Sequence, residues 1–406
     1  MSKTTVRPTQ ARSENYREVD DKAALGLLMD LLPVPGLSGQ ENEITEFIRG
    51  KLRQAGVPAD AIVTDDAHKR SPLGGQNGNL ICQFPGTARG KRRLLMAHMD
   101  TVPLCAGTRP VLSGGYIRSG NPKTGLGGDN RSGIGAILNA ALTILKHKLP
   151  HPPLTFFFPV QEEVGLFGVR FARLALLGQP KLCFNWDGNR PNCMVVGATG
   201  AYRMNITVRG LASHAGVAPE KGVSAIAIAG MAIHELQSNG WHGLVSKNGK
   251  RGTSNIGVIN GGNATNVVAD EVLLRAEARS HDPRFRRQIV TAYERAFARA
   301  VKQLKSIDGR RGQTEIKADL HYESFRLAEN NESVAAARQA IEALGMKAES
   351  KISNGGLDAN WLTERGLPTV TLGAGQQDVH TLNEKLQVDS YLMGCRAALA
   401  LATAAM

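Results

Sequence analysis

Ala97-His98-Met99-Asp100-Thr101-Val102-Pro103 follows directly on a short apolar run that begins at Arg93. We interpret that run as a β-strand, because side-chain alternation then places His98 and Asp100 on one side of its end and Met99 on the other. An imidazole and a carboxylate that converge in this way are both ligands that Zn²⁺ accepts. A His-x-Asp pair at a strand end can also be a hydrogen-bonded structural pair, so other parts of the chain must decide between these roles.

The chain has the composition of a globular α/β protein with room for two domains: 406 residues, 42% hydrophobic, with 45 glycines. It contains no apolar run of about eighteen residues, and residues 1–20 lack the apolar core of a secretory signal, so we expect a soluble protein with a flexible N-terminal tail. Five widely spaced cysteines, an odd number, argue against a disulfide framework and favour a reducing cytoplasm. We interpret Cys105 as a buried thiol rather than a nucleophile.

The formal net charge of +13 raises the question of nucleic acid or an acidic substrate. Much of the excess lies in one basic segment: Arg284, Arg286, Arg287, Arg295, Arg299, Lys302, Lys305, Arg310 and Arg311. We expect these cations to spread around a long helix as a solvated face rather than to form one stripe. The interleaved aromatics Phe285, Tyr293 and Phe297 share one helical face, which indicates core packing rather than base stacking. The sequence therefore predicts no nucleic-acid or membrane partner.

Acidic residues stand at the ends of further apolar segments. The run Leu154 to Val160 is typical of a strand buried on both faces, and it is followed by Glu162 and Glu163. Two adjacent carboxylates at the end of a buried strand are costly without a cation or protons to compensate them. A surface loop with two acids is the alternative. Asp129 precedes the expected helix Ile134 to Leu145, where it could also be a simple N-cap.

Two more strands repeat the pattern. Lys181 to Trp186 is followed by Asp187, and Pro368 to Leu372 is followed by a polar loop that contains His380. Open α/β sheets bind ligands at the carboxyl ends of their strands. We therefore expect these side chains to gather with His98 at one edge of a sheet, where they would act as metal ligands.

At about residue 200 the hydrophobic pattern changes to that of alternating strands and amphipathic helices, which predicts an inserted α+β domain. We predict a flexible tail at 1–20, a first part of the main domain at 21–199, the insertion at 200–317 and the second part of the main domain at 318–406. Within the insertion we expect strands at 203–209, 254–260 and 272–279, helices at 222–237 and 282–305, and a polar loop at 238–252.

Taken in order, the motifs resemble those of the M20 family of co-catalytic zinc metallopeptidases, and most closely its peptidase T branch. They are His98-x-Asp100-Thr101, Gly128-Asp129-Asn130, Glu162-Glu163, Asp187-Gly188, Ser213-His214-Ala215-Gly216, Gly356-Leu357-Asp358 and His380. The resemblance covers nearly the whole chain from about Asp21. It implies a two-domain α/β fold: a mixed-sheet zinc-exopeptidase catalytic domain with an inserted α+β lid and dimerisation domain.

The resemblance also implies two zinc ions per chain, with cobalt or manganese as substitutes. His98 and Asp187 would hold one ion, Glu163 and His380 the other, and Asp129 would bridge them. Three carboxylates nearly neutralise two dications, and the remaining positive charge would acidify a water molecule held between them. The expected reaction is hydrolysis by the resulting metal-bridged hydroxide.

Further roles come from the same resemblance. Glu162 would be the general base, Asp100 would fix the tautomer of His98, and His214 would stabilise the oxyanion, reaching the active site of a partner subunit. Action of His214 in a partner subunit would require a homodimer, which we expect to form through the inserted domain.

Asn266, Arg279 and Gly356 match positions that would bind substrate, and Arg279 suits the terminal carboxylate of a short peptide. A strand-end surface arginine is the alternative for Arg279. The chain departs from the branch at Asn130, where a second acid is often found, and at Leu357, where a small polar residue is common. Neither departure removes a metal ligand, and both bear on substrate preference.

The sequence thus predicts a cytoplasmic dizinc aminopeptidase that removes the N-terminal residue of tripeptides or other short peptides. The alternative within the same family is a carboxypeptidase, dipeptidase or N-acyl amino acid amidohydrolase. The alternative from another class is a catalytically silent nucleic-acid-binding protein that uses the net positive charge.

Overall fold

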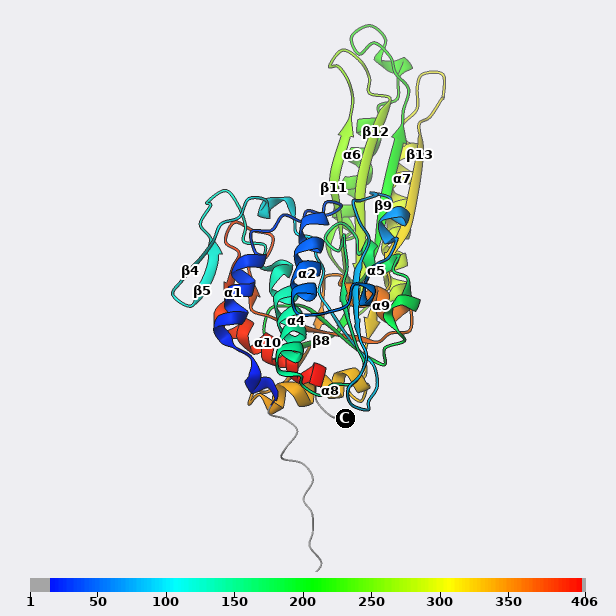
Figure 1. The fold of residues 1–406 in the computed structure, drawn as a ribbon. Helices are drawn as coiled ribbons and strands as arrows, with labels where there is room; N and C mark the ends of the chain where they lie inside the picture. The colour runs from blue at the N-terminus through cyan, green and yellow to red at the C-terminus, as the bar shows by residue number, and fades with distance from the viewer. Residues whose placement is uncertain (1–14, 404–406) are drawn as a thin grey trace, which may run out of the picture. The chain divides into compact units, whose positions relative to one another are not determined.

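The computed structural model describes residues 15–403, which form two compact units (Figure 1). Unit 1 contains the chain up to Gly197, Arg326–Ser353 and the chain from Leu357 onward, and unit 2 contains Ala198–Phe325 and Asn354–Gly356. Most of the predicted flexible tail, residues 1–14, lies outside the described residues, whereas Asn15–Glu18 forms a 3-10 turn.

Unit 1 is built on a nine-stranded mixed sheet in the order β1-β2-β6-β3-β7-β16-β8-β14, with β15 also paired to β8. Its strands are β1 (Ile62–Thr64), β2 (Leu80–Phe84), β3 (Arg93–Met96), β6 (Leu154–Phe158), β7 (Leu182–Gly188), β8 (Cys193–Ala198), β14 (Phe325–Arg326), β15 (Glu349–Ser353) and β16 (Thr369–Gly373).

The four strands at the centre of this sheet place the candidate ligands. Every residue of β3, β6 and β16 is buried, as expected for parallel strands that are covered on both faces. β6, β3, β7 and β16 run parallel in adjacent positions, so their carboxyl ends meet at the same edge of the sheet. This arrangement accounts for the repeated acid or imidazole after an apolar run.

Helices lie on both faces of the sheet (Figure 1). On one face, α5, α9 and Leu177 pack on Leu94, Met96 and Phe157. On the other face, α4 contacts β3 and β7, and α10 contacts α4 and β16. The helices of unit 1 are α1 (Asp21–Leu31), α2 (Asn42–Gln54), α3 (Ala67–Arg70), α4 (Gly128–His147), α5 (Phe167–Arg170), α8 (Glu332–Ala343), α9 (Asp358–Glu364) and α10 (Val388–Thr403).

The glycine-rich passage before α4 contains a hairpin that belongs to a separate four-stranded sheet, in the order β17-β18-β5-β4. Gly114 and Gly115 both adopt positive φ at its turn, a backbone conformation that glycine tolerates at little cost. The strands are β4 (Pro110–Ser113), β5 (Tyr116–Ser119), β17 (Gln376–Gln377) and β18 (Lys385–Gln387). This sheet links the loop after β16 to the segment that leads into α4.

Unit 2 is a five-stranded antiparallel sheet in the order β10-β11-β12-β9-β13, with two helices packed on one face. Asp282 caps α7 by accepting a hydrogen bond from the amide of Phe285, and Phe285, Tyr293 and Phe297 are buried in the core, as predicted. The elements are β9 (Gly200–Arg209), α6 (Ala225–Ser238), β10 (Gly243–Lys247), β11 (Lys250–Gly261), β12 (Glu271–Ser280), α7 (Pro283–Gln303) and β13 (Gln313–Tyr322).

The structure differs from the predicted insertion in two places. The expected loop at 238–252 contains β10, which forms a hairpin with β11 through Asn248 and Gly249, both at positive φ, a common hairpin turn. Unit 2 also continues past the predicted boundary at 317, because β13 pairs with β9 as far as Tyr322 opposite Ala201. Both missed strands lie at the edges of the sheet, and β13 carries mostly polar residues.

Two expectations based on composition can be compared with the structure. All five cysteines are buried and free of disulfides, as expected. Among residues 15–403, no helix combines the length and apolar character needed to cross a membrane.

Candidate metal centre

The loops that follow the four parallel strands carry the candidate ligands. His98 follows β3, Glu163 follows β6 and His380 follows β16, whereas Asp187 is the last residue but one of β7. Asp129 comes from the first turn of α4, where its φ and ψ of −83° and 104° are not helical. The common strand direction brings residues from across unit 1 to one edge of its sheet.

Asp129 lies between two imidazoles. Its Oδ1 is 3.2 Å from Nε2 of His98, and its Oδ2 is 3.4 Å from Nε2 of His380. His98 Nε2 is also 3.8 Å from Asp187 Oδ1, and His380 Nε2 is 3.0 Å from Glu163 Oε1. The side chains form two donor groups, His98–Asp129–Asp187 and Asp129–Glu163–His380, each with its ligand atoms within 4.8 Å of one another. The two groups share one carboxylate.

The electrostatics of the site show why these donors fit cations. Burial raises the pKa of Asp187 to about 6 and that of Glu163 to about 7. Hydrogen bonds to Asp129 and Glu163 raise the pKa of His380 to about 10. These two carboxyls and the His380 imidazole therefore keep their protons to a higher pH than exposed groups of the same kind do. Neutral imidazole nitrogens and carboxylate oxygens in two groups that share Asp129 suit a pair of divalent ions.

Asp100 connects two of the strand ends. Its Oδ1 lies 3.3 Å from Nδ1 of His98, the ring nitrogen on the side away from Asp129. Its carboxylate also accepts hydrogen bonds from the amides of Glu162 and Glu163, at 2.9 and 3.1 Å, and from the hydroxyl of Ser38 at 2.6 Å. Asp100 can thus orient the His98 ring and the acidic loop together.

Glu162 belongs to a third group of potential ligands, with His98 and Glu163. Burial raises the pKa of its carboxyl well above the ordinary value. Within residues 15–403, no hydrogen bond or ion pair of the Glu162 carboxyl is found, whereas Glu163 contacts His380. Of the two adjacent acids, Glu162 therefore has the carboxyl that is available to a water molecule.

Two further buried acids adjoin the centre. In the described part of the chain, both carboxyl oxygens of Asp358 are buried without a hydrogen-bond partner, and burial raises the pKa of Asp358 well above the ordinary value. Glu384 is 2% exposed and accepts hydrogen bonds from backbone amides of the loop that carries Asp129. Sequence reasoning named Asp358 only as part of a motif and missed Glu384. Its position four residues after His380 was the available signal.

The remaining predicted residues lie in unit 2. His214 is exposed, and its Nδ1 accepts hydrogen bonds from the amides of Gly216 and Val217, both at 3.2 Å. Because Nδ1 acts as an acceptor, the ring proton is on Nε2, which is free to donate. The amide of Ala215 donates to the carbonyl of Asn266 at 2.9 Å, so His214 and Asn266 lie on paired segments.

Arg279 and Gly356 have neighbours that bear on their predicted roles. Arg279 forms a two-pronged pair with Glu277, with both nitrogen–oxygen distances 2.9 Å. It is therefore an arginine with an internal carboxylate partner. Gly356 packs against Tyr322, whose ring would lie 2.3 Å from a Cβ at this position, so close packing accounts for glycine there.

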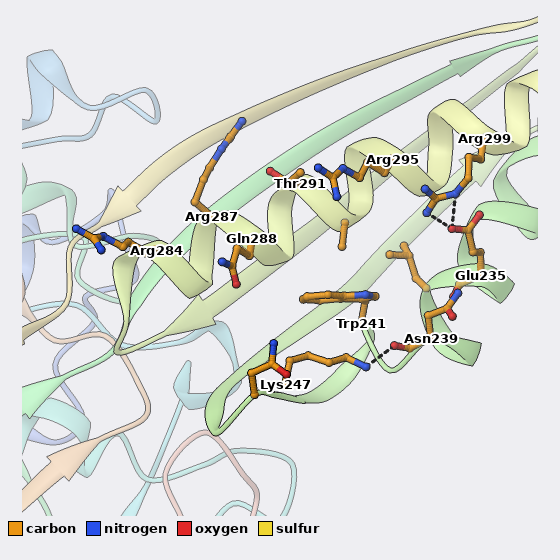
Figure 2. Close-up of a pocket in the computed structure, with 13 residues that line it drawn as sticks. Glu235, Asn239, Trp241, Lys247, Arg284, Arg287, Gln288, Thr291, Arg295 and Arg299 are labelled. Carbon is orange, nitrogen blue, oxygen red and sulfur yellow. Dashed lines mark hydrogen bonds and ion pairs between the residues drawn. The ribbon is translucent and has the colours of Figure 1, made fainter.

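The basic segment of unit 2 does not spread evenly around α7, which corrects the sequence interpretation. Arg284, Arg287, Arg295 and Arg299 line one pocket of about 900 Å³, together with residues of α6 and β10 and with Trp241 from the segment between them (Figure 2). The prediction was wrong because part of the segment lies beyond the helix or is buried, as Arg286 is against Glu323. Arg299 pairs with Glu235 inside the pocket.

Known proteins resemble this chain over most of its length. The family model for peptidase family M20/M25/M40 matches residues 94–404. YqjE of Bacillus subtilis is 31% identical over 372 residues, which are 91% of this chain and 95% of that protein. A tripeptidase of Staphylococcus aureus is 31% identical with a TM-score of 0.84 over 95% of this chain and 98% of its own. The aminopeptidase PepT of Bacillus cereus is 31% identical with a TM-score of 0.80 over 95% and 99%.

Proposed function

The chain belongs to peptidase family M20/M25/M40, and from that premise we propose that it is an aminopeptidase that removes the N-terminal residue of tripeptides and other short peptides. The observation that carries the proposal is the sharing of Asp129 by two donor groups, in a chain that matches a tripeptidase and an aminopeptidase over nearly its full length. Shared carboxylates are typical of two-metal hydrolytic centres.

The two donor groups support a proposed set of metal ligands. His98 and Asp187 would hold one ion, Glu163 and His380 the other, and Asp129 both. Zinc is the proposed metal, since it accepts imidazole and carboxylate ligands, and cobalt or manganese are proposed substitutes. When bound, the two ions would polarise the scissile carbonyl and lower the pKa of water at the site.

Glu162 is the proposed general base. Its carboxyl has no partner among the described residues, and the hydrogen bond from its amide to Asp100 fixes the backbone that carries it. Glu162 would accept the proton of the attacking water and deliver it to the amine that leaves. Burial raises the pKa of the Glu162 carboxyl well above its ordinary value, so the carboxylate accepts a proton more readily than an exposed glutamate would.

His214 would donate from Nε2 to the oxyanion that forms on the scissile carbonyl. Its ring is already oriented by the two amides that donate to Nδ1, so the donor is prepared before substrate binds. Asn266 on the paired segment would bind a polar group of the peptide.

Arg279 would bind the terminal carboxylate of the peptide. The two hydrogen bonds to Glu277 fix the orientation of the Arg279 guanidinium. The remaining N–H donors of the guanidinium fit a second carboxylate. Gly356 is the third proposed substrate-binding residue, and its contribution would come from its backbone, since the Tyr322 ring occupies the space where a side chain would lie.

We place His214 in the active site of a second copy of the chain, with a homodimer formed through unit 2. β10 and β13 end the unit 2 sheet, and edge strands are able to pair with another chain. The test mixes Glu162→Gln with His214→Ala, two variants that we expect to be inactive when each is assayed alone. Action between subunits predicts roughly one quarter of wild-type activity after subunit exchange, because half of the dimers then hold one complete site. No recovery with proven exchange would place His214 in the active site of its own chain.

The substrate experiment compares a free tripeptide with its N-acetylated and C-amidated forms, using zinc-loaded protein. An aminopeptidase cleaves the free tripeptide and rejects the acetylated one, whereas loss of the terminal carboxylate weakens binding through Arg279. Cleavage of the acetylated peptide alone would establish a carboxypeptidase or amidohydrolase instead. Salt-sensitive binding of unrelated oligonucleotides without any hydrolysis would favour the nucleic-acid alternative.

A further inference from the structure

Glu384 joins the two loops that carry Asp129 and His380. It lies four residues after His380, and the residue is 2% exposed. Oε2 accepts a hydrogen bond from the amide of Gly127 at 2.7 Å, and Oε1 accepts one from the amide of Asp129 at 3.0 Å. One carboxylate thus anchors the backbone on both sides of Gly128.

The loop around Asp129 packs closely against the Glu384 carboxylate. A Cβ on Gly125 would lie 3.1 Å from Glu384 Oε2, and one on Gly128 would lie 3.4 Å from Oε1. Small residues therefore allow the backbone to approach the carboxylate closely. The hydrogen bond from Cys105 Sγ at 3.5 Å adds a third, weaker donor.

The side chain of Asp129 needs a defined direction, because its two oxygens face different imidazoles. Its backbone is not helical at this point, so the regular hydrogen bonds of α4 do not fix it. The contacts of Glu384 supply that constraint from the same loop that provides His380.

We propose that Glu384 is a positioning residue that holds Asp129 in the orientation both metal sites require. The inference rests on the proposed two-metal function and adds a residue that acts on both ions through their shared ligand. Outer contacts of this kind orient ligands, and their loss weakens metal binding.

The test uses Glu384→Gln, because glutamine keeps the shape but has only one acceptor oxygen. Its NH₂ group would then face a backbone N–H that also donates, and one of the two anchors is lost. Zinc binding to the metal-free protein is measured by calorimetric titration, and the absorption spectrum of the cobalt form reports ligand geometry. We expect both apparent metal affinities to fall by about 10- to 100-fold, the cobalt spectrum to change, and kcat to fall with KM nearly unchanged.

The matched control is Asp65→Asn, elsewhere in unit 1. Asp65 is also a buried carboxylate that accepts hydrogen bonds from backbone amides, those of Asn79 and Ala67 at 2.9 and 3.0 Å. This variant should lower Tm and leave metal affinity and the cobalt spectrum unchanged, because Asp65 anchors no proposed ligand.

The outcomes separate the inference from the proposed function. Wild type that binds two metals, with Glu384→Gln matching it in affinity, spectrum and kcat, would overturn the role of Glu384 alone. Wild type that fails to bind two metals would overturn the proposed function. If Glu384→Gln does not fold, Glu384→Asp is measured in the same way, since its shorter side chain cannot reach both amides. Wild-type metal affinity in that variant would also overturn the inference.

Discussion

The Nε2 atom of His380 lies 3.0 Å from Oε1 of Glu163, although 217 residues separate them in the chain. The contact forms because β6 and β16 run in the same direction within one sheet, so the loops that follow them reach the same edge. His98 and Asp187 meet Asp129 from β3 and β7 in the same way. Each half of the centre thus combines residues from distant parts of the sequence.

Replacing His380 with alanine should remove one metal and leave the other. The donor group formed by His98, Asp129 and Asp187 does not include His380. We expect the bound metal, measured by elemental analysis after dialysis, to fall from about two ions to about one per chain. Retention of both ions, or loss of both, would contradict the division of the ligands into two groups.

The stability of the metal-free protein should fall as pH rises. Glu163 and Asp187 have pKa values of about 7 and about 6 in the folded protein, above the ordinary 4.5 and 3.8, because burial disfavours their charged forms. Their contribution to stability is therefore fully present below about pH 4 and is lost as pH rises through 6 to 7. His380, with a folded pKa of about 10, changes stability in the same direction.

Thermal unfolding from pH 4.5 to 8 checks this prediction. The metal-free protein should have a Tm that decreases with pH, whereas added zinc should remove most of the decrease near pH 7, because cations then compensate the carboxylates. A metal-free Tm that rises steadily over this range would show that these acids are not the dominant groups.

Cys105 should not act as a nucleophile. Burial raises the pKa of its thiol above the ordinary value, and Glu384 nearby raises it further, so the reactive thiolate is scarce at neutral pH. Cys105→Ser should keep activity within about threefold of wild type, with slow alkylation of the native thiol. Rapid inactivation by iodoacetamide that the serine variant escapes would refute this prediction.

Gly133 should be intolerant of a side chain. A Cβ there would lie 2.2 Å from the carbonyl oxygen of Trp186, the residue before Asp187, and would push α4 away from β7. We expect Gly133→Ala to lower the free energy of unfolding by about 1–3 kcal/mol and to weaken metal binding. Urea denaturation and zinc titration measure the two effects.

Gly26→Ala in α1 is the matched control, since no atom lies within 4 Å of a Cβ at Gly26. Alanine should stabilise that helix by roughly 0.5–1 kcal/mol. Equal effects of the two substitutions would mean that the contact with Trp186 is not a constraint.

Much of unit 1 could be predicted because the signals for its strands and ligands lie within short stretches of sequence. Buried parallel strands appear as apolar runs, and the costly acids that follow them, such as Glu162 and Glu163, are visible without knowledge of the pairing. Strand order was not visible, and it decides that Asp129 faces both His98 and His380.

The features that were missed depend on tertiary contacts. Glu384 has the sequence context of a loop acid, and only the folded chain shows that its carboxyl accepts two distant amides. In β13, exposed residues alternate with partly buried ones along most of the strand, and most of its side chains are polar. The end of this strand was therefore not apparent before its pairing with β9 was known. The Asn248-Gly249 turn was a local signal for β10 that could have been used.

The most direct test of the account measures metal content and hydrolysis of an unblocked tripeptide for wild type and Glu162→Gln. We predict about two metals per chain in both proteins, activity in wild type, and a loss of roughly 10²-fold or more in kcat for the variant. That result would show that Glu162 is needed for hydrolysis and is not needed to hold the metals. Near wild-type activity in Glu162→Gln, or wild type that binds metal but cleaves no free-amine peptide, would contradict the proposed aminopeptidase mechanism.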